Sequence, residues 1–273
     1  LNPSTKGEVR LKADAFDLLA RSGGVDAQRL LPEEHRVIVT DPQSLFPRWH
    51  PGLCAFPGMS NVNRVEYARL VIYQLRSGKV CLLGSVKGGG TVFAVGKKDS
   101  AKMREVWHGA AISQAAVPPP SPPCLASPSA LLGLESSDAR PLLVSKRDGR
   151  CLFDQLRAPF ELREYFGRPP VRIRELLATG DITREELAKH LGGLSRVGDH
   201  CLVYPASVVW PMGFAWSSYI AQANMLKVCE TAGLTRNKIL CDSLPTPYMQ
   251  RDVFALATDD VMVFTRPKSQ AVH

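Results

Sequence analysis

The strongest constraint on the fold is a proline-rich segment near the middle of the chain. The stretch VPPPSPPCLASPS, residues 117–129, places six prolines between residues 118 and 128. Proline has no backbone N–H and fixes φ, so neither a helix nor a central strand tolerates this density. We expect an extended connector, acting as a spacer rather than as a ligand for an SH3-type domain. We therefore expect the helices and strands to lie in two regions, one before this connector and one after about residue 130.

A helix is predicted well ahead of this connector. Asn63 and Glu66 form a capping-box pattern. The run VEYARLVIYQLRSG that follows has apolar residues at helical spacing and stops at Gly78. We therefore expect a helix over residues 64–77. Residues 1–62 read as irregular, with turn signals and no clear motif, and their role is left open.

Two strands with basic residues are predicted next. The segments TVFAVGKK (91–98) and MREVW (103–107) flank a tight turn. Lysine and arginine on one face of such a hairpin could grip a triphosphate, arginine through two parallel hydrogen bonds. A solvated surface hairpin is the alternative. The basic residues are Lys97, Lys98, Lys102 and Arg104.

After the connector, two predicted strand elements end in acids. PLLV (141–144) looks like a buried strand that leads into Asp148, and DVFALA–TDD–VMVF predicts a hairpin with Asp259 and Asp260 at its bend. Phosphoryl transfer needs carboxylates that hold magnesium, and two ions about 3.5–4 Å apart serve the attacking and leaving oxygens. Each acid taken singly also suits an ordinary turn.

A strand-to-helix turn, WPMGFAWSSYIAQ, completes the candidate elements. Gly213 would let the backbone pass close to a flat ligand, and Ser217 and Ser218 would cap the helix. An ordinary turn followed by a helix N-cap explains the same residues.

Composition narrows the class of partner. The net charge is +8, which favours anionic partners, with nucleic acid first among them. Seven dispersed cysteines suggest reduced thiols in an intracellular protein of the cytoplasm or nucleus, without structural zinc. No apolar run is long enough for a membrane helix, so no membrane partner is expected. Because the chain begins with Leu1, we expect it to be a piece of a longer protein.

Four of these segments, in this order, resemble the fingers and palm of reverse transcriptases, the RNA-directed DNA polymerases of retroelements and retroviruses. TVFAVGKKDSAKMREV is similar to their fingers hairpin, and SKRDGRCLFDQL to their first palm motif. PMGFAWSSYIAQ resembles the motif P-x-G-x-x-x-S-P-x-x-F-Q, with Pro211, Gly213, Ser217 and Gln222 matching, and TDDVMVF resembles the x-D-D motif. The resemblance covers about residues 63–267.

The resemblance implies an α/β (α+β) right-hand polymerase core that lacks its thumb. Residues 1–62 would be a segment of unknown role, 63–130 the fingers, and 131–273 a palm whose antiparallel sheet packs on helices. The reaction would be template-directed DNA synthesis, which is nucleotidyl transfer from a deoxynucleoside triphosphate to a primer 3′-hydroxyl. The partners would be an RNA or DNA template with its primer; the oligomeric state stays open.

The resemblance also assigns roles to single residues. Two Mg²⁺ ions, or Mn²⁺, would be held by the catalytic carboxylates of Asp148, Asp259 and Asp260. Phe153, five residues after Asp148, would exclude a 2′-hydroxyl and so select deoxynucleotides. The other nucleotide-binding residues would be Lys97 and Arg104 on the triphosphate, the backbone amides of Cys151 and Leu152 facing the phosphates, and Met212 and Gly213 flanking the nascent base pair.

Some positions depart from the family pattern. Ala257 replaces an aromatic residue, Met212 a glutamine and Ser218 a proline, and WHGAAIS stands where the family often has Asp, Arg and Asn. Two alternatives therefore remain. One is a catalytically decayed, retroelement-derived protein that only binds nucleic acid. The other is an RNA-dependent RNA polymerase, which would use ribonucleotides.

Overall fold

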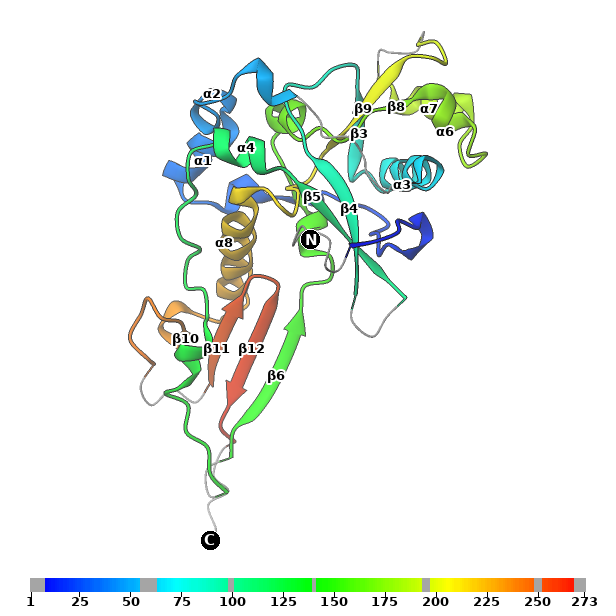
Figure 1. The fold of residues 1–273 in the computed structure, drawn as a ribbon. Coiled ribbons are helices and arrows are strands. Elements are labelled where there is room, and N and C mark those ends of the chain that lie inside the picture. Colours follow the sequence, from blue (N-terminus) through cyan, green and yellow to red (C-terminus); the bar gives the residue numbers. More distant parts are fainter. Residues whose placement is uncertain are drawn as a thin grey trace. The chain divides into compact units, whose positions relative to one another are not determined.

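The computed structural model of the chain describes residues 8–54, 63–97, 101–138, 141–192, 197–247 and 252–267. The fold is a mixed α+β structure, as expected (Figure 1). The chain divides into two compact units. Unit 1 comprises Leu1–Pro118 and Phe153–Ser217, and unit 2 comprises Pro119–Leu152 and Ser218–His273. The expected division at residues 62 and 130 stays a prediction, because compactness alone does not assign fingers or palm.

Unit 1 contains most of the helices. Its strands are β1 (Glu8–Val9), β2 (Val25–Asp26), β3 (Val80–Leu83), β4 (Thr91–Gly96), β5 (Met103–His108), β7 (Leu156–Arg157), β8 (Val171–Arg172) and β9 (Leu202–Ser207). Its α-helices are α1 (Glu33–Thr40), α2 (Pro42–Leu45), α3 (Arg64–Ser77), α4 (Ala110–Ala115), α6 (Ile173–Leu177) and α7 (Arg184–His190). Its 3-10 helices are η2 (Ala13–Ala15), η3 (Ala27–Leu30), η4 (Pro51–Cys54) and η6 (Phe160–Tyr165).

The predicted helix and basic hairpin are both present in unit 1. Helix α3 covers Arg64–Ser77, begins with Asn63 accepting a hydrogen bond from the Val65 amide, and ends at Gly78 with φ 73°. Strands β4 and β5 pair antiparallel, and β1 joins the other side of β4 to give the order β1-β4-β5. The hairpin tip, residues 98–100, lies outside the described residues. A second sheet has the order β3-β9-β8.

Two predictions about helix caps are wrong. Glu66 does not complete a capping box on Asn63; its carboxylate accepts a hydrogen bond from the Ala13 amide instead. Ser217 does not cap α8 (Ala215–Thr231), because its hydroxyl donates to the Pro211 carbonyl, while Ser113 accepts from the Ala215 amide. In both cases a residue distant in sequence competes for the local hydrogen bond.

Charged side chains are buried beside β5. Glu105 forms ion pairs with Arg168 at 2.8 Å and with Lys79 at 3.6 Å, and it accepts a hydrogen bond from Gln74. Lys79 also pairs with Asp154 at 2.9 Å. Buried charges require such partners, so this cluster fixes β5 against α3 and the segment around Asp154.

Unit 2 is built on a four-stranded sheet in the order β10-β11-β12-β6. Strands β11 and β12 form the predicted acidic hairpin, and β6 adds to β12 antiparallel (Figure 1). Strand β10 pairs parallel with β11. The strands are β6 (Leu143–Asp148), β10 (Ile239–Leu240), β11 (Asp252–Ala257) and β12 (Asp260–Thr265), with 3-10 helices η5 (Pro128–Leu131) and η7 (Arg236–Lys238). Helices α5 (Leu152–Gln155) and α8 contain residues of both units.

Different segments of the chain pack on the two faces of this sheet. Phe254 and Leu256 of β11 pack with Leu226 and Cys229 of α8. On the opposite face, Val253 and Phe264 cluster with the end of the proline-rich connector and with residues between it and β6; the packed residues there include Ala126, Ala130, Leu131, Leu134 and Leu142. Helix α8 therefore supports the middle of the sheet.

The prediction that the strand leading to Asp148 is buried is wrong. All six residues of β6 are exposed, and Leu143 and Val144 retain 57% and 60% of their accessible surface. The reason is its position: β6 is the edge strand and lies beside β12, away from β11, which carries the contacts with α8. Local hydrophobicity does not distinguish an edge strand from a central one.

Candidate functional site

The three acids that sequence analysis singled out lie together at one end of the sheet of unit 2. Asp148 is the last residue of β6 and is directly opposite Asp260, the first residue of β12. The β11–β12 turn consists of Thr258 and Asp259, because Ala257 pairs with Asp260. Opposed residues of antiparallel strands have Cβ atoms about 4.5–5.5 Å apart, so Asp148 and Asp260 share one face of the sheet.

The turn that carries Asp259 is held in a strained form by a buried side chain. Thr258 has φ 58°, a conformation that costs free energy for a β-branched residue. Gln222 of α8 is fully buried, and its side-chain oxygen accepts a hydrogen bond of 2.7 Å from the Thr258 amide. Its NH₂ group donates to the carbonyls of Pro123 and Leu256. Gln222 is one of the residues that match the motif P-x-G-x-x-x-S-P-x-x-F-Q, and in the structure its side chain supports the acidic turn.

A second contact ties the end of β6 to the same turn. The Gly149 amide donates a hydrogen bond of 2.7 Å to the Asp259 carbonyl. A side chain at Gly149 would have its Cβ 3.0 Å from Met225 and 3.3 Å from the Asp259 carbonyl oxygen. Glycine therefore permits the close approach that keeps Asp148 beside Asp259.

Lys146 is a basic residue of the acidic cluster that sequence analysis did not single out. Its Nζ lies 2.8 Å from Oδ2 of Asp260, and both side chains are partly exposed. This hydrogen bond, followed by the charges of Asp260, Asp148 and Asp259, raises the pKa of Lys146. All three carboxylates thus act on one ammonium group, which offsets part of their mutual repulsion. The signal in the sequence is the spacing K-x-D, which places Lys146 on the same strand face as Asp148.

The cluster fits magnesium in its donor chemistry. Mg²⁺ prefers carboxylate and carbonyl oxygens, and it keeps several waters, which an exposed strand end allows. The side chains, however, are not arranged around a common ion. Within the described ranges, there is no group of three or more His, Cys, Asp or Glu side chains that could hold a metal ion. Asp260 instead pairs with Lys146. The backbone therefore brings the acids to one place, and their side chains would have to rotate to share an ion.

The residues after Asp148 form a tight turn. Cys151 has φ 49°, and the buried Leu152 begins α5. The Leu152 amide donates to the Gly149 carbonyl at 3.1 Å, so this amide is used inside the turn and not turned outward for a phosphate. The predicted role of the Cys151 amide stays a prediction. Phe153 is half-buried, and its predicted role in sugar selection stays a prediction as well.

The predicted triphosphate ligands lie on the basic hairpin of unit 1. Arg104 is exposed on β5, opposite Val95. Lys97 follows β4, and its Nζ forms an ion pair of 2.8 Å with Asp17. Lys102 reaches the other oxygen of Asp17 at 3.3 Å. The hairpin therefore presents basic side chains, two of which bind an acid from the N-terminal segment.

Met212 and Gly213 lie against β5 within unit 1. The Trp107 amide donates to the Met212 carbonyl at 3.2 Å. Gly213 has φ 114°, and a Cβ at this position would be 2.0 Å from the Trp107 carbonyl oxygen. The glycine is thus required by close packing of two protein backbones, whereas sequence analysis attributed it to a flat ligand. Their role beside a nascent base pair stays a prediction.

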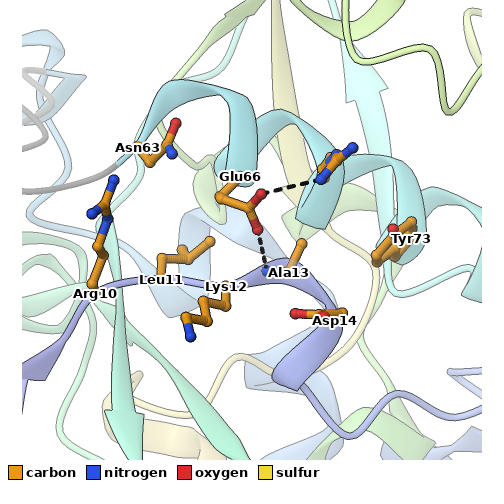
Figure 2. A pocket seen from close by; sticks show the side chains of 9 residues that line it. Arg10, Leu11, Lys12, Ala13, Asp14, Asn63, Glu66 and Tyr73 are labelled. Atoms are coloured by element: carbon orange, nitrogen blue, oxygen red, sulfur yellow. Dashed lines mark hydrogen bonds and ion pairs between the residues drawn. The ribbon is translucent and has the colours of Figure 1, made fainter.

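A pocket of about 430 Å³ lies between the N-terminal segment and α3 (Figure 2). Glu66 projects into it from α3 and accepts hydrogen bonds from the Ala13 amide at 2.8 Å and from Arg69 at 3.3 Å. Three basic and two acidic side chains line the pocket, so the charge of its lining favours neither an anionic nor a cationic ligand strongly. The lining residues are Arg10, Leu11, Lys12, Ala13, Asp14, Asn63, Glu66, Arg69 and Tyr73. We assign these contacts to docking of the N-terminal segment on α3.

Of the helices within the described ranges, none combines the length and the apolar character that crossing a membrane demands. No protein-family model matches the chain, and a search of curated proteins finds no match either.

Proposed function

We propose that the chain is the nucleotide-transferring core of a reverse transcriptase and that it adds deoxynucleotides to a primer 3′-hydroxyl under the direction of an RNA or DNA template. The observation that carries the proposal is the placement of Asp148 opposite Asp260, beside the turn that holds Asp259. More than a hundred residues separate Asp148 from the other two acids in the sequence. Their meeting at one partly exposed end of the sheet is what metal-dependent phosphoryl transfer requires.

The chemistry follows from the residues of the cluster. Asp148, Asp259 and Asp260 would hold two Mg²⁺ ions, which when bound supply charge stabilisation for the transferred phosphoryl group. Lys146 would keep the carboxylates together before an ion arrives, because it already pairs with Asp260. The net charge of +8 supports a nucleic acid as the partner, since each neutralised phosphate releases counterions.

The test is single-nucleotide primer extension with magnesium, comparing the unmodified chain with Asp259→Asn. The substitution keeps the size of the side chain and removes its charge. We expect incorporation to fall by about a hundredfold or more, on the order of the loss when one group that stabilises transition-state charge is removed. The matched control is Asp252→Asn, the same change at the opposite end of the same hairpin, which pairs with Thr265. Equal incorporation by the two variants would contradict the proposal.

The second candidate is a non-catalytic, retroelement-derived protein that binds nucleic acid. It is favoured by the ion pair of Asp260 with Lys146, which engages the carboxylate of one predicted metal ligand with a lysine. This candidate predicts salt-sensitive binding to a primer–template duplex, unchanged in Asp259→Asn, with no incorporation by either protein. Filter binding at two salt concentrations, run beside the extension assay, separates the two candidates.

A further inference from the structure

Two free cysteines meet in the interior of unit 2. Cys124 lies within the proline-rich connector, and Cys241 is the residue after β10. Both side chains are buried in the hydrophobic cluster that packs β11 against α8, and their thiols are hydrogen-bonded to each other. More than a hundred residues separate the two cysteines in the sequence, so only folding brings them together.

Neighbouring hydrogen bonds hold the two segments in this arrangement. The Ala126 amide donates to the Leu256 carbonyl of β11 at 2.8 Å. Ser129 Oγ donates at 2.8 Å to Oδ1 of Asp242, the residue after the second cysteine. Cys124 has φ 49°, a left-handed conformation that a residue other than glycine keeps only where its surroundings enforce it. The contact between the thiols is therefore imposed by the fold around them.

The surroundings of the pair limit which reagents can reach it. The reactive form of a cysteine is the thiolate, and burial, followed by the neighbouring Cys241, raises the pKa of Cys124. The pair should therefore react slowly at neutral pH. The Cys241 thiol also shares a hydrogen bond of 3.4 Å with the hydroxyl of Ser243, which is exposed, so this thiol lies at the edge of the cluster. A small, uncharged oxidant suits such a place better than a bulky one.

We infer that Cys124 and Cys241 form a redox-dependent disulfide, with a peroxide as the oxidant, and that this bond fastens the proline-rich connector to the end of β10. One thiolate attacks an oxygen of hydrogen peroxide, which gives a sulfenic acid and releases hydroxide. The second thiolate attacks the sulfenic sulfur and displaces another hydroxide. The two thiol protons convert both hydroxides to water, so two thiols and one peroxide become one disulfide and two waters.

The disulfide would also restrain the support of the acidic turn. Pro123 precedes Cys124, and its carbonyl accepts a hydrogen bond of 3.0 Å from the side-chain NH₂ of Gln222. The side-chain oxygen of Gln222 in turn accepts from the Thr258 amide at 2.7 Å. A covalent bond at Cys124 therefore fixes the segment on which Gln222 depends. The inference stands apart from the proposed function, because these contacts exist whether or not the chain copies nucleic acid.

The direct test is treatment of the folded, reduced chain with hydrogen peroxide. The remaining thiols are then alkylated, and the chain is digested without reductant and analysed by mass spectrometry. We expect one dominant pair of peptides joined through Cys124 and Cys241, which a dithiol reductant separates. The matched control is the same treatment in denaturing urea, where the pairings should scatter over the cysteines. A folded chain in which this pair does not dominate, or in which both thiols stay open to alkylation, would overturn the inference.

Urea unfolding measures the fastening itself. The bond closes a loop of more than a hundred residues, so oxidation should raise the unfolding midpoint of the unmodified chain by about 1 M. Cys229→Ala, which removes a third cysteine of the same cluster, should keep this rise, and Cys124→Ala should lose it. Each protein is compared before and after peroxide, so the stability lost through the substitution itself cancels. Equal rises in all three proteins, or no rise in the unmodified chain, would contradict the fastening.

Discussion

At the scale of single residues, the acidic cluster depends on backbone contacts that few residue types allow. Gly149 approaches the turn of Asp259 closely, and Thr258 adopts a left-handed conformation. Strain of this kind persists only where the surroundings enforce it, and it is often found at functional sites. Here the buried amide of Gln222 enforces it. These residues therefore hold the acids in place, and they do so at the cost of local backbone strain.

A substitution at Phe153 tests whether the chain selects deoxynucleotides over ribonucleotides. The resemblance implies that its ring excludes a 2′-hydroxyl, so Phe153→Ala should raise the incorporation of ribonucleotides relative to deoxynucleotides by about tenfold or more, the scale of steric discrimination in a pocket. The measurement is the ratio of the two incorporation efficiencies. Phe160→Ala, at a phenylalanine that is 70% exposed, should leave the ratio unchanged. Ribonucleotide use by the unmodified chain, without a gain in Phe153→Ala, would favour an RNA polymerase.

A substitution at Gly213 tests how closely the turn before α8 packs on β5. Gly213→Ala places a Cβ 2.0 Å from the Trp107 carbonyl oxygen at φ 114°, so the free energy of unfolding should fall by about 2–4 kcal/mol. Gly180→Ala isolates the backbone cost, because Gly180 has φ 74° and no atom within 4 Å of its Cβ position; its loss should be about 1–2 kcal/mol. Urea denaturation measures both. Equal losses would show that the contact with Trp107 carries no cost.

At the scale of elements, the sequence predicted those whose signals are local. Helix α3 has an N-cap at Asn63 and a stop at Gly78, and the β11–β12 hairpin has two apolar runs around a bend. Helices α1 and α2 were missed, although Asp41 caps α2 and Pro42 follows as a helix-starting residue. The exposure of β6 and the pairing of Asp17 with Lys97 depend on distant segments. No local pattern could have shown them.

The hydrogen bonds through which Gln222 of α8 supports the β11–β12 hairpin can be tested by substitution. Gln222→Leu keeps a similar volume but leaves the Thr258 amide and two carbonyls without their partner. The free energy of unfolding should fall by about 1–3 kcal/mol, the cost of buried groups that lose their hydrogen bonds. Primer extension should fall further than stability alone explains, since the turn carries Asp259. Asn224→Leu, which removes a buried amide bonded to the Ile220 carbonyl of the same helix, should lower stability and spare incorporation.

At the scale of the whole molecule, stability should fall in acid because of the buried ion cluster of unit 1. Burial raises the pKa of Glu105, but the charges of Arg168 and Lys79 outweigh it and hold the pKa below its usual 4.5. A carboxyl whose folded pKa is lowered stabilises the fold above its unfolded pKa, and this contribution is lost as the pH falls through the folded pKa. The free energy of unfolding should therefore decline below about pH 4.5.

Glu105→Gln separates this effect from general acid denaturation. At pH 7 the variant should lose about 3–5 kcal/mol, because Arg168 keeps a buried charge without its partner. Its free energy of unfolding should depend less on pH below pH 4.5 than that of the unmodified chain. Glu34→Gln, at an exposed glutamate of α1, should change neither quantity. Identical pH dependence in Glu105→Gln and the unmodified chain would contradict the assigned role.

We propose that folding joins Asp148 to Asp259 and Asp260 in one cluster that holds divalent cations, and cleavage of the chain by a bound iron ion tests this directly. Iron(II), bound in place of magnesium, reacts with added hydrogen peroxide to give iron(III), hydroxide and a hydroxyl radical, and the radical cuts the backbone next to the ion. We expect cuts in two regions distant in sequence, near residue 148 and near residue 259, and both should disappear in Asp259→Asn and with excess magnesium. Cuts at only one of these regions, or a pattern unchanged in Asp259→Asn, would contradict it.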